Sequence, residues 1–267
     1  MILNLEFITP TFLCGANQGK AELRAPSLRG ELRWWFRVLG ADAEEERKVL
    51  GGLGEPTIAS RVITRIGEIQ ARHEELPKMP ALSDLGYLYY FASVSGEVKG
   101  IRVRRDAYFA PGTRFVFSAS ERRSISPSSR ARLDQALCAF KRLGAVGLRA
   151  TRGCGAISDV DDVISFDAFM EWANTLTPCG VICKPLSREA FDSWTKCQGS
   201  LGGWLRAFRK EHKLSAQTSK SALGYSHGKQ RQSSALRLRP IRVKEGYVAL
   251  LVYTDAACRE ATLAPLL

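Results

Sequence analysis

The sequence predicts an α+β protein: a ferredoxin-like unit over residues 1–160, followed by a second, reduced copy over residues 161–267. Three observations support this fold class. Short segments alternate between apolar and polar residues, as strands with one buried face do. Longer segments carry apolar residues at helical spacing. Through residue 160 these segments follow one another as strand, helix, strands, helix and strand, which is the order of a ferredoxin-like sandwich.

The first unit opens with an alternating strand at residues 2–8, which Thr9-Pro10 ends. Further strands are predicted at residues 61–69, 87–94 and 113–119, and a short one after a glycine-rich turn. The stretch 87–94 is apolar enough for a buried strand. Helices are predicted at residues 26–40, at residues 41–50, and from Ser126-Pro127 to Gly144, because proline and serine favour a first helical turn.

The second unit is shorter and more basic. We expect a helix at residues 166–176, a strand at 180–186, a basic helix at 201–212 and a polar loop at 213–234. Residues 235–243 and 247–253 are predicted to pair as a hairpin around Lys244-Glu245-Gly246. These elements repeat part of the first unit, and the boundary falls near residues 159–164.

Composition favours a polyanionic partner. The formal net charge is +12 over 267 residues, and each phosphate that such a protein neutralises releases counterions. No segment approaches 18 uninterrupted apolar residues, so no membrane partner is expected. Residues 1–7 lack the features of a signal peptide, which predicts a cytoplasmic protein. The seven scattered cysteines are expected to be free thiols, and neither a metal nor a cofactor is expected.

The stretch SLRGELRWWFRVLG, residues 27–40, combines cationic and aromatic side chains. On a helical projection Leu28, Leu32, Trp35 and Leu39 form a core stripe, whereas Arg29, Arg33 and Arg37 form a separate cationic stripe. Trp34 lies off the core side. Two interpretations stay open. The arginines contact phosphates and Trp34 stacks on a base, or the stripe is a solvated basic face and Trp34 covers a neighbouring element.

A second motif, GAVGLRATRGCGAIS, places four glycines around two arginines: Gly144, Gly147, Gly153, Gly155, Arg149 and Arg152. Glycines allow the main chain to approach a phosphate closely. The pattern is neither a dinucleotide-binding nor a P-loop motif, because the spacing and the following strand do not fit either. The alternative is a flexible turn between helix and strand.

Residues 206–242 carry ten cations against one acid, Glu211. A mobile polar loop explains part of this excess. In the predicted strand 235–243, however, Arg237 and Arg239 alternate with Leu236 and Leu238, which predicts a cationic strand face and favours contact with nucleic acid. We expect Arg33, Arg152 and Arg231 to converge in a single groove for a ribose-phosphate strand.

Candidates for catalysis are few. Asp161 and Asp162 are adjacent carboxylates without partner ligands, and His73 stands beside two glutamates in a predicted loop. Asp106 lies among arginines, where it assists RNA cleavage or, more simply, forms a salt bridge. We therefore expect no catalytic residue.

These motifs together resemble the RAMP proteins of CRISPR–Cas systems. The segments FITPTFLCGA, ELRAPSLRGELRWWFRVLG, SRV and GAVGLRATRGCGAIS carry the resemblance, which covers residues 1–160 strongly and residues 220–253 weakly. The pattern is most similar to that of the subunit numbered first in the type III-B Cmr effector complex, or of a close type III variant. Thr151 stands where a second basic residue is usual, and QRQSSAL, from Gln230, resembles a family motif in which proline replaces Ala235.

The resemblance implies tandem ferredoxin-like, RNA-recognition-motif-like domains. It implies a non-catalytic subunit of a ribonucleoprotein whose partners are the CRISPR guide RNA, bound towards its 3′ end, the paired target RNA and other Cas subunits. The expected RNA contacts are Arg24, Arg29, Arg33, Trp34, Arg37, Arg61, Gly147, Arg149, Arg152, Gly153, Gly155, Lys229, Arg231 and Arg237. Two alternatives stay open: a RAMP endoribonuclease that processes guide precursor or cleaves target RNA, and an assembly scaffold with little RNA contact.

Overall fold

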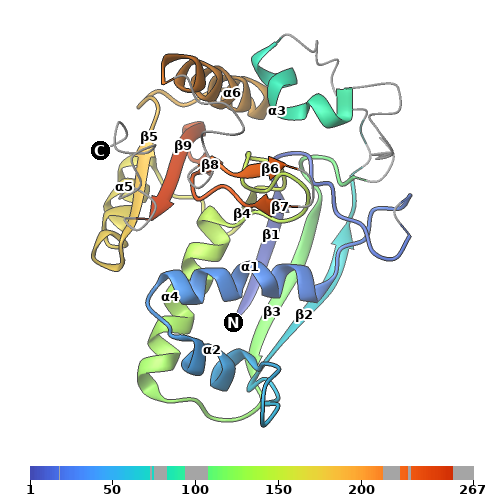
Figure 1. Ribbon diagram of the computed structural model, residues 1–267, viewed down its shortest axis with the longest axis vertical. Coiled ribbons are helices and arrows are strands. Elements are labelled where there is room, and N and C mark those ends of the chain that lie inside the picture. Colours follow the sequence, from blue (N-terminus) through green and yellow to red (C-terminus); the bar gives the residue numbers. More distant parts are fainter. Residues whose placement is uncertain are drawn as a thin grey trace.

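A computed structural model describes residues 1–17, 19–72, 74, 83–93, 108–212, 223–227 and 230–254, of which residues 90–93, 225–227 and 230–232 are described as backbone alone. It is an α+β protein with two antiparallel sheets, stacked along the long axis of the molecule (Figure 1). No helix in these ranges is long and apolar enough to cross a membrane.

The first sheet has the strand order β2-β3-β1-β4. Its strands are β1 (Ile2–Phe7), β2 (Val62–Gln70), β3 (Arg114–Glu121) and β4 (Ile157–Asp159). A helix follows β1 and another follows β3: α1 (Ala25–Val38) and α4 (Pro127–Leu143). Both pack on the same face of the sheet, where Leu28 and Phe140 share one core with Leu5. The four strands and these two helices follow one another in the order βαββαβ.

Local sequence explains most of these elements. Along β1, Leu3, Leu5 and Phe7 are buried while the residues between them are more exposed, so alternation creates one core face. Helix α4 begins as predicted, because the Ser126 hydroxyl accepts a hydrogen bond from the Ser129 amide. Helix α2 (Ala43–Leu50) has Asp42 as N-cap, three glutamates in its first turn and two cations in its last, which matches the helix dipole.

The second sheet has the order β5-β9-β8. It comprises β5 (Val181–Pro185), β8 (Arg237–Val243) and β9 (Gly246–Thr254), and β8 and β9 form the predicted hairpin. Helices α5 (Phe166–Asn174) and α6 (Trp194–Glu211) accompany it, with a short 3₁₀ turn at Thr177–Cys179. Both faces are buried. Ile241 and Val243 join the core of the first sheet, and Leu238 and Leu251 join a second core beneath α6. One hydrophobic core is therefore shared by the two sheets.

Three element predictions are wrong. The buried strand expected at residues 87–94 is a helix, α3 (Asp84–Ser93), because Ser83 caps it by accepting a hydrogen bond from the Gly86 amide at 2.9 Å. Its buried residues Leu88 and Tyr89 pack into the second core with α6. Helix α6 begins seven residues earlier than expected, at Trp194 rather than Leu201. The predicted polar loop contains two short paired strands, β6 (Tyr225–His227) and β7 (Gln230–Gln232).

Candidate nucleic-acid interface

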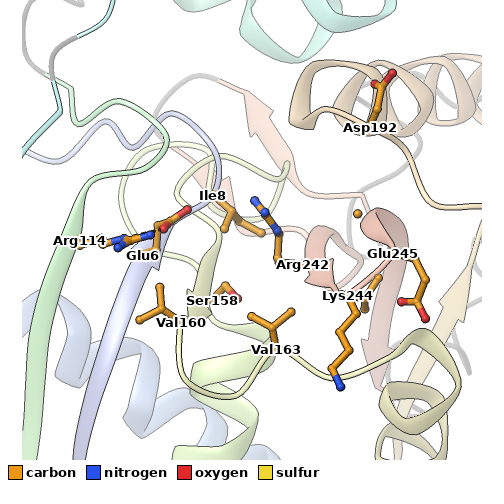
Figure 2. Close-up of a pocket in the computed structure, with 12 residues that line it drawn as sticks. Glu6, Ile8, Arg114, Ser158, Val160, Val163, Asp192, Arg242, Lys244 and Glu245 are labelled. Carbon is orange, nitrogen blue, oxygen red and sulfur yellow. Dashed lines mark hydrogen bonds and ion pairs between the residues drawn. The ribbon is translucent and has the colours of Figure 1, made fainter.

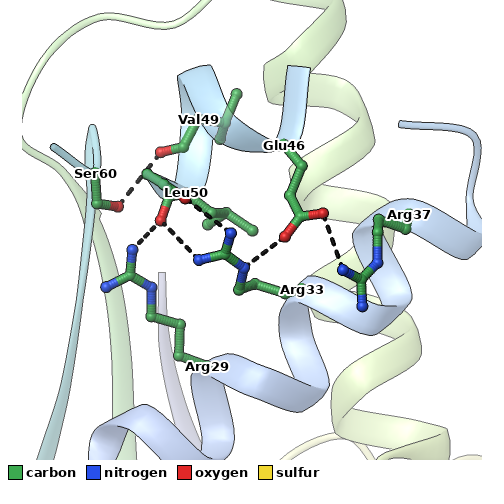
Figure 3. A network of polar contacts seen from close by, with 8 residues as sticks. Arg29, Arg33, Arg37, Glu46, Val49, Leu50 and Ser60 are labelled. Atoms are coloured by element: carbon green, nitrogen blue, oxygen red, sulfur yellow. Dashed lines mark hydrogen bonds and ion pairs between the residues drawn. The ribbon is translucent and has the colours of Figure 1, made fainter. Parts of the chain in front are cut away.

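The arginine stripe of α1 faces α2 rather than open solvent (Figure 3). Arg29 and Arg33 donate hydrogen bonds to the Leu50 carbonyl, and Arg33 also donates to the Gly51 carbonyl at 2.8 Å. The Glu46 carboxylate accepts from Arg33 Nε at 2.5 Å and from Arg37 Nη1 at 3.2 Å. These carbonyls form the negative end of the α2 dipole, so cations are stabilised there. The stripe binds an element of its own chain.

Burial differs along this stripe. Burial and the neighbouring Arg33 lower the pKa of Arg29. The Glu46 side chain is only 7% exposed, whereas those of Arg33 and Arg37 are 30% and 52% exposed. The solvated basic face of the second interpretation is thus a clamp on α2. The RNA contact expected of these three arginines stays a prediction.

The adjacent face of α1 packs against the second sheet. Glu31 accepts hydrogen bonds from Arg237 at 2.9 Å and from Arg239 at 3.4 Å. The Arg237 guanidinium lies 3.3 Å above the centre of the Trp34 ring, so one face of that ring is occupied by a cation–π contact. Trp34 covers a neighbouring element, as the second alternative for this motif proposed.

The cationic strand face predicted for residues 235–243 is wrong. Arg239 is fully buried and Arg237 nearly so, because they share a strand face with Ile241 and Val243, which lie in the core. Burial, reinforced by Arg237, lowers the pKa of Arg239 to about 9. The sequence indicates this burial, because Arg237 and Arg239 alternate in step with the apolar residues Ile241 and Val243. Counting charges alone does not reveal it.

Arg239 holds the glycine-rich loop, residues 144–155, at both sides. Its Nε donates to the Leu143 carbonyl at 2.7 Å, and its Nη1 donates to the Ala150 carbonyl. The loop is further tied to α6 and to the segment that follows β1, since the Gly153 carbonyl accepts from Gln198 at 2.6 Å and from the Thr9 hydroxyl at 2.8 Å. The turn is therefore held by side chains from three separate parts of the chain. None of these anchors was predicted as a functional residue.

The loop glycines adopt backbone conformations that other residues rarely adopt. Gly147, Gly153 and Gly155 have positive φ angles of 89°, 88° and 65°. A Cβ atom on Gly155 would lie 1.9 Å from the Val146 carbonyl oxygen, so no side chain fits there. Gly147 and its neighbour Leu148 are the exposed edge of the loop. Gly147 and Leu148 are the most exposed residues of the motif.

The two loop arginines differ in position. Arg149 is half-buried with a φ of 61°, a left-handed conformation that is uncommon outside glycine. Arg152 is 6% exposed, and its Nη2 donates to the Leu223 carbonyl. In Figure 1 the loop and α2 lie on opposite sides of α1. The single groove expected to contain Arg33 and Arg152 is therefore wrong.

The other predicted RNA contacts are scattered. Arg24 is exposed near Glu22, at 3.9 Å. The Arg61 side chain donates to the Ser124 carbonyl at 2.8 Å, and the Arg61 carbonyl accepts from the Arg122 amide. These contacts bring Arg61 and Arg122 together at the far end of the first sheet. Sequence reasoning missed Arg122 as part of this group. Lys229 and the side chain of Arg231 lie outside the described residues.

Of the candidate catalytic residues, the structure describes Asp161 and Asp162, and both bind side chains of the first sheet and α4. The Asp162 carboxylate accepts hydrogen bonds from Lys141 at 2.8 Å and from Arg142 at 2.7 Å. Partial burial raises the pKa of Asp162, but these two cations outweigh it, so the pKa is lowered. Asp161 accepts from Asn4 at 2.6 Å. His73 and Asp106 lie outside the described residues. In the ranges that the structure describes, no three His, Cys, Asp or Glu side chains form a metal-binding group, and six of the seven cysteines are present there as free thiols.

A cavity of about 390 Å³ opens between the first sheet and the β8–β9 turn (Figure 2). Its walls include the Arg114–Glu6 ion pair, with 3.0 Å between Nε and Oε2, and the side chains of Arg242 and Lys244. Glu245 also lines it and accepts from the Phe166 amide. None of the predicted RNA-binding residues lines this cavity. Because its charges are of both signs, it is not a polyanion site.

Residues 4–158, which contain α1, the glycine-rich loop and most of the first sheet, match the family model described as the RAMP superfamily. The chain belongs to the RAMP superfamily. This RAMP protein is related to Cmr1 of the type III-B CRISPR Cmr complex: over 168 residues it is 30% identical to "CRISPR system Cmr subunit Cmr1-1" of Pyrococcus furiosus. It is 31% identical over 180 residues to "CRISPR system Cmr subunit Cmr1-2" of the same organism.

Each alignment includes 58% of this chain. The alignments cover 46% of Cmr1-1 and 92% of Cmr1-2, so the chain spans about half the length of the first relative.

Solved structures show the same fold. The apo crystal structure of Cmr1 from Pyrococcus furiosus has a TM-score of 0.63 at 20% identity, over 95% of this chain and 87% of that one. A chain of the type III-B Cmr-β complex bound to cognate target RNA and AMPPnP has a TM-score of 0.59 at 12% identity, over 100% and 99%. This RAMP protein thus has a Cmr1-like RAMP fold.

Proposed function

We propose that this RAMP protein is a non-catalytic, RNA-binding subunit of a cytoplasmic type III CRISPR–Cas effector ribonucleoprotein. In that particle it contacts the guide RNA towards its 3′ end, the paired target RNA and other Cas subunits. Its relationship to Cmr1 and its net charge of +12 support this role.

One observation carries the proposal: the glycine-rich loop is held from beneath while its edge is open. Arg239 binds the carbonyls on either side of the edge, and Gly147 and Leu148 are exposed. A rigid backbone edge binds a phosphate or base without first losing conformational entropy. Arg149, one residue along the chain, supplies a guanidinium for a phosphate. The exposed arginines Arg24, Arg37 and Arg61 are secondary candidates.

The same proposal includes the domain organisation. Residues 1–160 form a ferredoxin-like unit, which the strand order β2-β3-β1-β4 supports. Residues 161–267 form a reduced second unit, supported by the three-stranded sheet with α5 and α6. Because the two sheets share a core, we expect neither unit to fold by itself.

The test is a binding assay with labelled guide RNA, alone and paired with target, over a series of salt concentrations. Arg149→Glu should weaken binding by about tenfold or more and reduce the salt dependence. Arg188→Glu, in an exposed turn elsewhere, is the matched control and should have much less effect. Equal affinity of the two variants would overturn the proposed role of the loop. Site-selective RNA cleavage that Asp106→Ala or His73→Ala abolishes would overturn the non-catalytic assignment.

A further inference from the structure

A buried arginine of the glycine-rich loop meets no carboxylate among the residues that the structure describes. Arg152 is 6% exposed, and its Nη2 donates to the Leu223 carbonyl. Its Nη1 is buried and has no hydrogen-bond partner. A buried donor left without an acceptor is costly, and it is more so when the group is charged.

A second arginine approaches from α6. Arg209 Nη1 donates to the Tyr87 hydroxyl at 2.7 Å, so this contact joins α6 to α3. Its Nε is also buried without a hydrogen-bond partner. Two guanidinium groups from distant parts of the sequence thus each present one unused donor.

The electrostatic surroundings of this pair are repulsive. Burial, together with the neighbouring cations Arg209 and Arg149, lowers the pKa of Arg152 to about 10, and Tyr87 acts in the opposite direction. Among the ion pairs of the described residues, no carboxylate meets Arg152 or Arg209. Arg239 provides the contrast: it is equally buried, but it meets Glu31 and uses Nε, Nη1 and Nη2 as donors.

We propose that Arg152 and Arg209 form a binding site for a single phosphate group beneath the glycine-rich loop. A phosphate has several acceptor oxygens and negative charge, so it satisfies both orphan donors and removes the repulsion between the guanidiniums. Because Arg152 is buried, the site suits one phosphate group rather than the side of an extended strand.

The phosphate has two sources, an RNA terminus or free inorganic phosphate, and the chemistry of the site is the same for both. The inference does not depend on the proposed RNA-binding function, since inorganic phosphate alone tests it. The full-length chain is titrated with sodium phosphate at constant ionic strength, followed by calorimetry and by thermal unfolding, in wild type and in Arg209→Gln. Lys210→Gln is the matched control, because it removes an exposed cation from the next position of α6.

Phosphate should bind wild type and Lys210→Gln with the same affinity and raise the unfolding temperature of both. In Arg209→Gln the dissociation constant should rise by about tenfold or more. Arg152→Gln should show the same loss of phosphate affinity if the variant folds. If it does not fold, Arg209→Gln alone tests the proposal. No phosphate binding to wild type, or equal binding to all variants, would overturn the proposal.

Short RNAs of one sequence then distinguish the sources. If an RNA with a terminal phosphate loses affinity in Arg209→Gln while its hydroxyl-ended counterpart does not, the site holds an RNA terminus. If only inorganic phosphate depends on Arg209, the site holds a free anion. Both results support a phosphate site at this pair.

Discussion

Helix α1 and the glycine-rich loop both carry arginines in motifs that predict RNA contact, but the protein uses the two sets differently. The α1 arginines donate to the carboxyl end of α2 and to Glu46. Arg152 of the loop is buried with one unused nitrogen and no carboxylate partner in the part of the chain that the structure describes. The α1 set thus has partners within the chain, whereas Arg152 meets no carboxylate among the described residues.

This difference shows that cation density in a sequence does not identify a ligand site. Carbonyl groups at a helix end attract guanidiniums as acids do, although they add no formal charge to the composition. The α1 stripe has such partners at Leu50 and Gly51. The informative feature is a buried cation with an unused donor, because the described part of the chain does not fully compensate its burial.

The largest effect should come from removing the anchor of the loop. Arg239→Ala removes the donor to the carbonyls of Leu143 and Ala150 and a partner of Glu31, and should lower the free energy of unfolding by about 4 kcal/mol. Chemical denaturation measures this loss. Arg242→Ala, on the same strand but exposed, is the control and should cost less than about 1 kcal/mol. Equal stability of the two variants would show that the loop does not depend on its buried arginine.

Glycine substitutions compare the two regions directly. Gly155→Ala in the loop should cost about 3 kcal/mol, since the new Cβ would lie 1.9 Å from the Val146 carbonyl oxygen. Gly30→Ala in α1 meets nothing within 4 Å and should stabilise the protein by about 1 kcal/mol, because alanine favours a helix. Thermal unfolding of both variants tests the pair. A tolerated alanine at residue 155 would contradict the rigid loop described above.

Sequence reasoning predicted the first unit well because its signals are local. The alternation of β1 and the serine cap of α4 depend on neighbouring residues, and both elements occur where expected. Helix α3 was mistaken for a strand because a short apolar run fits either element, and only the Ser83 cap distinguishes them. The second sheet has two buried faces, so its boundary with the first unit is a shared core that no local pattern marks.

The candidate site was less predictable because its contacts are distant in sequence. The helical projection correctly separated the arginine stripe of α1 from its core face, yet it did not reveal that α2 covers the stripe. Arg209 and Arg152 are 57 positions apart in the sequence, and the packing of α6 on the loop brings them close enough to repel each other. Arg239 was recognisable from its place between core residues, because strand alternation puts it on their face.

The smallest effect tests the clamp on α2 itself. Glu46→Ala removes the acceptor for Arg33 and Arg37 and should lower the free energy of unfolding by about 2 kcal/mol. Glu44→Ala, on the same helix with an exposed i,i+4 partner, should cost about 0.5 kcal/mol or less. In a double-mutant cycle, Arg33→Ala and Glu46→Ala should couple, because each removes the same contact. If Arg33→Ala instead weakens RNA binding and leaves stability unchanged, the α1 stripe serves RNA rather than α2, and the contrast with the loop is wrong.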